Sequence, residues 1–114
     1  MARRGCGECR KKLQDCLRYE LKWGQQKESL LERYKEGFKT PVIENWPKLR
    51  RELELYWQAF LDLQADRQVG FGGAGGLPFT SIWNYAQAYG IFGEDFKLFH
   101  YFIKKLDEVW LEAQ

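Results

Sequence analysis

The chain has few of the side chains that catalysis usually requires. It contains one histidine, two serines and two threonines among 114 residues. A nucleophilic site needs a nucleophile, a base and a group that orients the base, and no such set can be assembled here. Cys16 and His100 could form a dyad, but no sequence feature supports it, and His100 lies within an aromatic helical pattern. The sequence therefore predicts a protein that is not an enzyme.

Long apolar segments are also absent. No run approaches the roughly 18 residues that a membrane span needs, and the arginines near the start of the chain precede no hydrophobic stretch typical of a signal peptide. The net charge of +2 argues against nucleic-acid binding as the main role. We therefore expect a cytoplasmic protein that does not associate with membranes. Nucleic acid is not expected to be its principal partner.

Cysteine is scarce, and the odd count of three does not suit a disulfide framework. Cys6 and Cys9 form a Cys-x-x-Cys pair, and Cys16 follows seven residues later. A structural zinc site needs four ligands, and His100 is far away in the sequence. We expect no cofactor. The alternative is a zinc-stabilised, nucleic-acid-associated helical module that uses Cys6, Cys9, Cys16 and the N-terminal arginines.

Aromatic residues, in contrast, are abundant. Five Trp, six Tyr and eight Phe make up 17% of the chain. Each large ring can bury about 150–250 Å², so a domain of this size cannot easily enclose all of them. Exposed aromatic side chains are typical of surfaces that bind other proteins. The composition therefore favours a binding or assembly role.

Apolar residues recur at helical spacing along most of the chain, and no stretch shows sustained strand alternation. The expected helices cover residues 10–23, 25–37, 46–66, 80–89 and a last segment that begins at Gly93. Asn45 and Thr80 are expected helix caps, and Gly90 is expected to end a helix in the left-handed conformation. The sequence predicts an all-α fold, a small bundle of four to five helices.

The same patterns suggest how the chain is organised. Residues 1–45 are expected to form a basic N-terminal helical hairpin that carries the cysteines, and residues 46–114 a compact helical unit. At 114 residues the two parts together fit the size of one domain. Carboxylates of the later helices, including Asp107, are expected on solvated helix faces.

A glycine-rich loop is expected at about 67–78, between two aromatic helices. Its Gly-x-Gly-x-x-Gly pattern does not predict nucleotide binding, because the pattern follows a helix and no βαβ unit is present. The loop is either a connection with unusual backbone angles or a segment that docks on a partner. The candidate protein-binding residues are Arg67, Phe71, Gly72, Gly73, Leu77 and Phe79.

Several motifs of this region occur together: Asp-Arg-Gln-Val-Gly-Phe-Gly-Gly over 66–73, then Gly75-x-Leu77-Pro78-Phe79-Thr80 and Tyr85-Ala86-x-x-Tyr89-Gly90-Ile91. With Trp57-x-x-Phe60-x-x-Leu63 upstream and Phe99-x-x-x-Ile103-x-x-Leu106-Asp107 downstream, residues 55–111 resemble small proteins of the tail-gene clusters of long-tailed phages, the tail assembly chaperones. Residues 1–45 lie outside this resemblance. Ala74 and Gly76 stand where the family loop carries proline.

The resemblance implies a non-catalytic role in phage tail assembly. It implies binding to tail proteins, in particular keeping the tape-measure protein soluble while tail-tube subunits gather around it. A structural virion component, such as a tail or connector piece, is a further alternative. Oligomerisation is left open by the sequence.

Overall fold

The computed structural model describes residues 7–67, 69–70 and 73–114, and helices dominate this part of the chain. Three 3₁₀ turns, η2, η3 and η4, adjoin α1, α2 and α4, and two short strands pair with each other in an antiparallel hairpin. The all-α prediction is confirmed. The α-helices are α1 (Gly7–Trp23), α2 (Lys27–Lys35), α3 (Pro41–Glu44), α4 (Glu54–Leu63), α5 (Phe79–Ala88) and α6 (Gly93–Glu112). The shorter elements are η2 (Gly24–Gln26), η3 (Arg51–Leu53), η4 (Gln64–Asp66), β1 (Val69–Gly70) and β2 (Gly73–Ala74).

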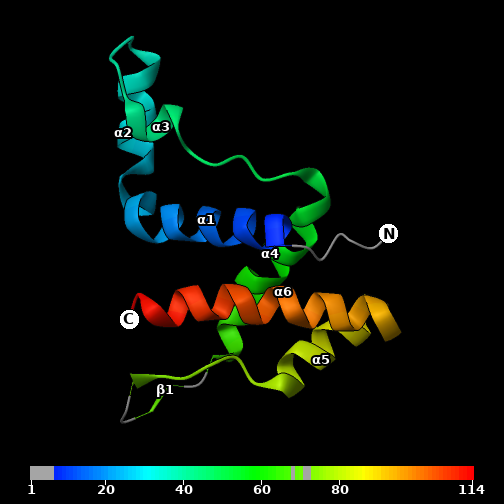
Figure 1. Ribbon diagram of the computed structural model, residues 1–114. Helices are drawn as coiled ribbons and strands as arrows, with labels where there is room; N and C mark the ends of the chain where they lie inside the picture. The colour runs from blue at the N-terminus through cyan, green and yellow to red at the C-terminus, as the bar shows by residue number, and fades with distance from the viewer. Residues whose placement is uncertain (1–6, 68, 71–72) are drawn as a thin grey trace.

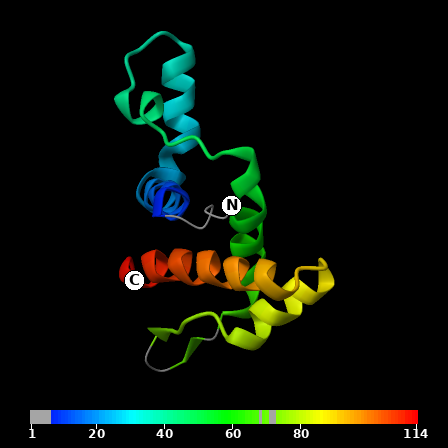
Figure 2. The ribbon, with the colours of Figure 1, turned by 45° about the vertical axis from the view of Figure 1, so that its right-hand side comes forward.

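Helix α6 is the longest element and forms the centre of the molecule. In Figure 1, α1 lies on one side of α6, while α5 and the short hairpin lie on the other. Figure 2 shows α4 passing from the side of α1 to the side of α5. All three helices contact α6, so each can bury an apolar face against it.

The hydrophobic core joins α1, α4, α5 and α6 in a single cluster. Each large apolar side chain that leaves water in such a cluster contributes about 1.5–3 kcal/mol. The most deeply buried members include Phe60, Ile82, Phe99, Phe102, Ile103 and Leu106. This burial fixes the position of α5, which carries part of the candidate site.

Helix α1 belongs to the same core. Leu13 and Leu17 are buried in the cluster, and the Gln14 side-chain amide donates a hydrogen bond of 2.9 Å to the Lys105 carbonyl in α6. Arg10 in turn donates to the Gln14 side-chain oxygen at 2.8 Å. The expected division near residue 45 stays a prediction.

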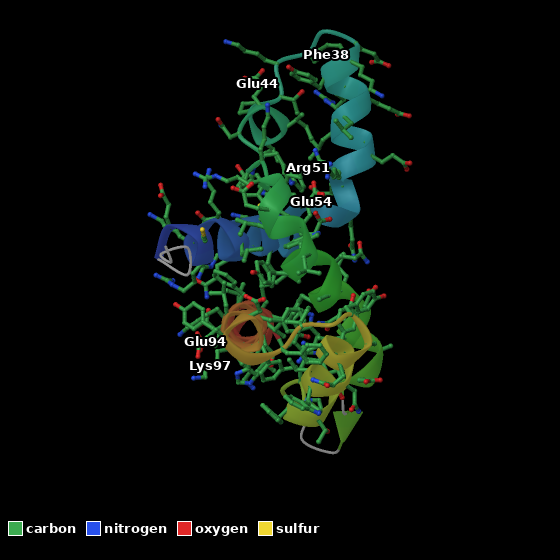
Figure 3. All side chains as sticks on the ribbon, turned by 90° about the vertical axis from the view of Figure 1, so that its right-hand side faces the viewer. Phe38, Glu44, Arg51, Glu54, Glu94 and Lys97 are labelled. Atoms are coloured by element: carbon green, nitrogen blue, oxygen red, sulfur yellow. The ribbon has the colours of Figure 1, made fainter. Side chains whose placement is uncertain are left out.

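Helices α2 and α3 project away from this core, and no residue of either helix is buried. Helix α2 ends at Lys35, and Gly37, two residues later, has a φ of +98°. The Phe38 amide donates back to the Arg33 carbonyl and the Gly37 amide to the Tyr34 carbonyl, both at 3.1 Å, the pattern of a Schellman motif. Phe38 lies at the outer end of the projection in Figure 3 and is 56% exposed.

Two expected helix starts are wrong. Residues 46–50 are not helical, so the third expected helix begins at η3, and Asn45 lies at the C-terminal end of α3. Contacts with α1 hold the segment: the Trp46 ring lies 5.1 Å from that of Tyr19, and the Pro47 carbonyl accepts a weak 3.8 Å bond from the Cys16 thiol. These tertiary contacts outweigh a local helical preference.

The second wrong start is at α5. Thr80 lies inside the helix, whose N-cap is Pro78 in an extended conformation without a side-chain cap. The expected end of the same helix is confirmed. Gly90 has a φ of +71°, and the Ile91 amide donates to the Ala86 carbonyl at 2.8 Å, as a Schellman motif requires.

Candidate protein-binding site

The glycine-rich segment connects η4 to α5 and contains the short hairpin. Val69 pairs with Ala74 and Gly70 with Gly73 in antiparallel register. Phe71 and Gly72, two of the candidate binding residues, lie outside the described residues. The described ends of the segment are held in place by the side chains of Arg67 and of Asp107 on α6.

A buried ion pair fixes the start of this segment. Arg67 and Asp107 form a bond of 2.6 Å, and their side chains are only 4% and 2% exposed. The other Arg67 nitrogens donate to the Gly75 carbonyl at 2.8 Å and to the Gln64 side-chain oxygen at 2.9 Å. The guanidinium also lies 3.7 Å from the centre of the Trp110 ring. Arg67 is therefore held by charge, hydrogen bonds and a cation–π contact.

The same carboxylate fixes the end of the segment. The second oxygen of Asp107 accepts a 3.0 Å hydrogen bond from the Leu77 amide, while the Leu77 side chain is buried in the core. Gly76 passes so close that an added Cβ would lie 3.2 Å from Asp107 Oδ2. Asp107 on α6 thus joins both ends of the segment, and we call the group of Arg67, Gly75, Leu77 and Asp107 the loop clamp.

The structure separates the candidate binding residues by environment. Arg67 and Leu77 turn their side chains inward, where they shape the loop. Phe79, two residues after the clamp, is 54% exposed. Gly73 forms part of β2. Of these described candidates, Phe79 is the one that presents a large apolar side chain to solvent.

Phe79 belongs to a group of aromatic rings from α5 and α6. Its ring lies 5.8 Å from Phe96, 5.2 Å from His100 and 6.4 Å from Trp83. Trp83 and Phe96 lie 5.0 Å apart and edge to face, within the range of favourable ring pairs. Trp83 is 43% exposed. We call Phe79, Trp83, Phe96 and His100 the aromatic cluster, and its outer face is open to a partner.

His100 takes part in this cluster as a ring rather than as a cation. Burial lowers the pKa of His100, and the nearby Lys104 lowers it further. The imidazole is therefore neutral at physiological pH, and its ring stacks against Phe96 at 5.8 Å. A neutral imidazole keeps the cluster predominantly apolar.

Comparison with known families identifies the chain. Residues 33–112 match the family described as phage tail assembly chaperone. The chain belongs to this family. Membership of this family gives the protein a role in phage tail assembly, in which it interacts with phage tail proteins. It also supports a non-catalytic function. No curated protein and no solved structure shows a significant match to the chain.

The family match includes both the loop clamp and the aromatic cluster. It begins within α2, so α1 lies outside it although α1 packs against α6. The resemblance of residues 55–111 to tail assembly chaperones is thereby confirmed, and the matched region extends further towards the N-terminus than the motifs alone indicated.

Sequence reasoning missed two parts of this site. Asp107 was expected on a solvated face, yet it is buried. Its spacing from Ile103 and Trp110, four and three residues away, places it on the core-facing side of α6 and could have signalled this. Trp83 and Phe96 were not singled out, because their proximity depends on how α5 packs on α6.

The structure describes two of the three proposed metal ligands, Cys9 and Cys16, and both lie on α1. Among residues 7–67, 69–70 and 73–114, no group of three His, Cys, Asp or Glu side chains could hold a metal ion. Cys6 lies outside the described residues. Cys16 is buried, and burial raises the pKa of its thiol, partly opposed by Lys12, which disfavours the thiolate that zinc requires. The zinc hypothesis stays a prediction.

No helix in the described ranges is long and apolar enough to cross a membrane.

Proposed function

We propose that this tail assembly chaperone binds the tape-measure protein of its phage through the aromatic cluster. It acts in the host cytoplasm and keeps that long, aggregation-prone polypeptide soluble while tail-tube subunits gather around it. The exposed aromatic cluster is the observation that carries this proposal. A group of contacting, partly exposed aromatic rings suits the capture of apolar segments of another polypeptide.

The exposed rings can contribute measurably to an affinity. A large ring buries about 150–250 Å² in total, so covering the exposed half of Phe79 removes about 100 Å² from water. At ~25 cal/mol per Å² this corresponds to about 2.5 kcal/mol. Trp83, which is 43% exposed, adds a similar amount. Association itself costs about 4–15 kcal/mol, so these two rings supply part of the binding energy and further contacts with the partner must supply the rest.

The loop clamp supports the cluster by fixing where α5 begins. Leu77 is hydrogen-bonded through its amide to Asp107, and Phe79 follows at the first position of α5. Asp107 and the Phe96 side of the cluster both belong to α6. The clamp therefore holds the α5 half of the cluster in register with the α6 half, which reduces the ordering cost of binding.

Co-expression with fragments of the tape-measure protein tests this proposal. Replacing Phe79 and Trp83 together by alanine should reduce both the soluble yield of the fragment and its recovery with the tagged chaperone. Phe38→Ala is a matched control, because Phe38 is equally exposed but lies at the end of the α2–α3 projection. Circular dichroism should show that all variants remain helical.

Two results would count against the proposal. Unchanged fragment recovery with the double variant would exclude the aromatic cluster as the binding surface. Detection of the protein as a stoichiometric component of purified virions would instead favour the structural virion alternative, because a chaperone leaves after assembly.

A further inference from the structure

A second surface lies on the opposite side of the molecule, where α1 faces the segment that leads into and out of α3. An open groove of about 590 Å³ separates the two. In Figure 1 this region lies between α1 and the chain that returns from α3 towards η3. We call it the α1–α3 groove. The residues that line it include Asp15, Arg18, Tyr19, Lys22, Trp23 and Pro47.

The lining of the α1–α3 groove combines rings with positive charge. The Tyr19 ring packs edge to face against Trp46 at 5.1 Å, which stiffens one wall. The Lys22 ammonium lies 5.3 Å from the Trp23 ring centre, and the Lys27 ammonium lies 4.6 Å from that of Trp46. Grooves lined by aromatic rings are one of the recurring surfaces that accept extended, proline-containing peptides.

The charge of the α1–α3 groove is predominantly positive. Its charged lining residues are two cations, Arg18 and Lys22, and one carboxylate, Asp15. Arg18 pairs with Asp15 at 3.3 Å, but both side chains are about half exposed, and such surface pairs contribute little stability. Arg18 can therefore exchange Asp15 for the carboxylate of a ligand at small cost.

A neighbouring cavity extends this surface towards the C-terminal end of α6. It measures about 270 Å³, shares Arg18 and Lys22 with the α1–α3 groove, and adds the apolar residues Leu21 and Val109 together with one carboxylate, Glu112. The two cations thus stand between two partly apolar depressions. An extended chain that crosses them could place acidic groups on the cations and apolar groups on either side.

We propose that the α1–α3 groove binds an extended acidic peptide segment of another protein. Carboxylates of the segment pair with Arg18 and Lys22, while its proline or apolar side chains contact Tyr19 and Trp23. A nucleic acid would also suit the cations, but the groove is lined in addition by Pro41, Val42 and Pro47, which offer no aromatic face on which bases could stack. A peptide ligand fits this arrangement better.

Fluorescence anisotropy with the full chain tests the inference. The probe is a fluorescein-labelled peptide of repeated Asp-Leu-Pro-Glu units, compared with a peptide in which Lys replaces both acids. The acidic peptide should bind, and binding should weaken as salt rises. The R18E and K22E substitutions together should weaken it by roughly tenfold or more. Lys97→Glu is the control, because Lys97 is also exposed and lies near the N-terminal end of α6 (Figure 3), whereas the second cavity lies at its C-terminal end.

Three outcomes would overturn the inference. They are equal binding of the acidic and basic peptides, unchanged binding by the charge-reversed variant, and preferential binding of a single-stranded oligonucleotide. This test is independent of the tape-measure proposal, because that proposal depends on α5 and α6 and its alanine variants leave the α1–α3 groove unaltered.

Discussion

Replacing Asp107 by asparagine is the sharpest test of the loop clamp. The change keeps the size of the side chain but removes its charge, and the new amide nitrogen is a donor. Both former partners, the Arg67 guanidinium and the Leu77 amide, are donors too. Only one of them can retain an acceptor oxygen. Arg67, whose side chain is 4% exposed, would then be a buried cation without its counter-ion.

The expected cost follows from that burial. Removing one partner of a buried ion pair typically destabilises a protein by about 3–5 kcal/mol, compared with a total stability of about 5–15 kcal/mol for a domain. Urea unfolding followed by circular dichroism should show a loss of this size. Hydrogen exchange should also show reduced protection of the Leu77 amide.

Two further variants make the measurement decisive. Glu108→Gln alters the adjacent carboxylate, which is 56% exposed and pairs with Lys105 at 3.3 Å, so it should cost less than about 1 kcal/mol. Adding Arg67→Met to the Asp107→Asn background removes the unpaired cation, so the double variant should be more stable than the sum of the single losses implies. Equal losses for the two acid-to-amide changes, or strictly additive losses at Arg67 and Asp107, would refute the clamp.

Two other changes test local features of the fold. Gly90→Ala should lower the free energy of unfolding by about 1–2 kcal/mol, because alanine is strained at the left-handed φ of Gly90. Gly24→Ala is the control, because a Cβ there would meet only the movable end of the Glu20 side chain. In the same urea titration it should lower the free energy of unfolding by less. Tyr85→Phe should raise the pKa of Asp62 towards its ordinary value, because the Tyr85 hydroxyl donates to that carboxylate at 2.7 Å and is the main cause of its lowered pKa. A carboxyl group whose pKa is lowered by folding stabilises the fold at neutral pH, and this stabilisation is lost as the pH falls through the folded-state pKa. The variant should therefore lose less stability on acidification. An unchanged titration of Asp62, followed by NMR, would contradict the assignment.

Local patterns in the sequence were sufficient to predict that the helices packing on α6 exist, although the expected starts of α4 and α5 were wrong. The spacing of Phe99, Ile103 and Leu106 predicted its buried face, and Gly90 marked the end of α5. These features depend on periodicity and on backbone conformation, which are properties of a short stretch of chain. The family resemblance came from the same region, where the motifs are densest.

Features that depend on distant partners could not be predicted in the same way. The segment after Asn45 reads as a helix, but Trp46 packs on Tyr19 of α1 instead. Arg67 was recognised as a candidate site residue, while its partner Asp107, forty positions later, was assigned to solvent. The aromatic cluster likewise exists only because α5 folds back against α6.

The loop clamp has an evolutionary consequence. Its anchoring groups are a carboxylate on α6, an arginine side chain and two backbone groups, so both ends of the segment depend on the single carboxylate of Asp107. A substitution at Asp107 would therefore release both ends together. We therefore expect a lineage that changes Asp107 to change Arg67 as well, because losing either residue alone leaves a buried charge unpaired.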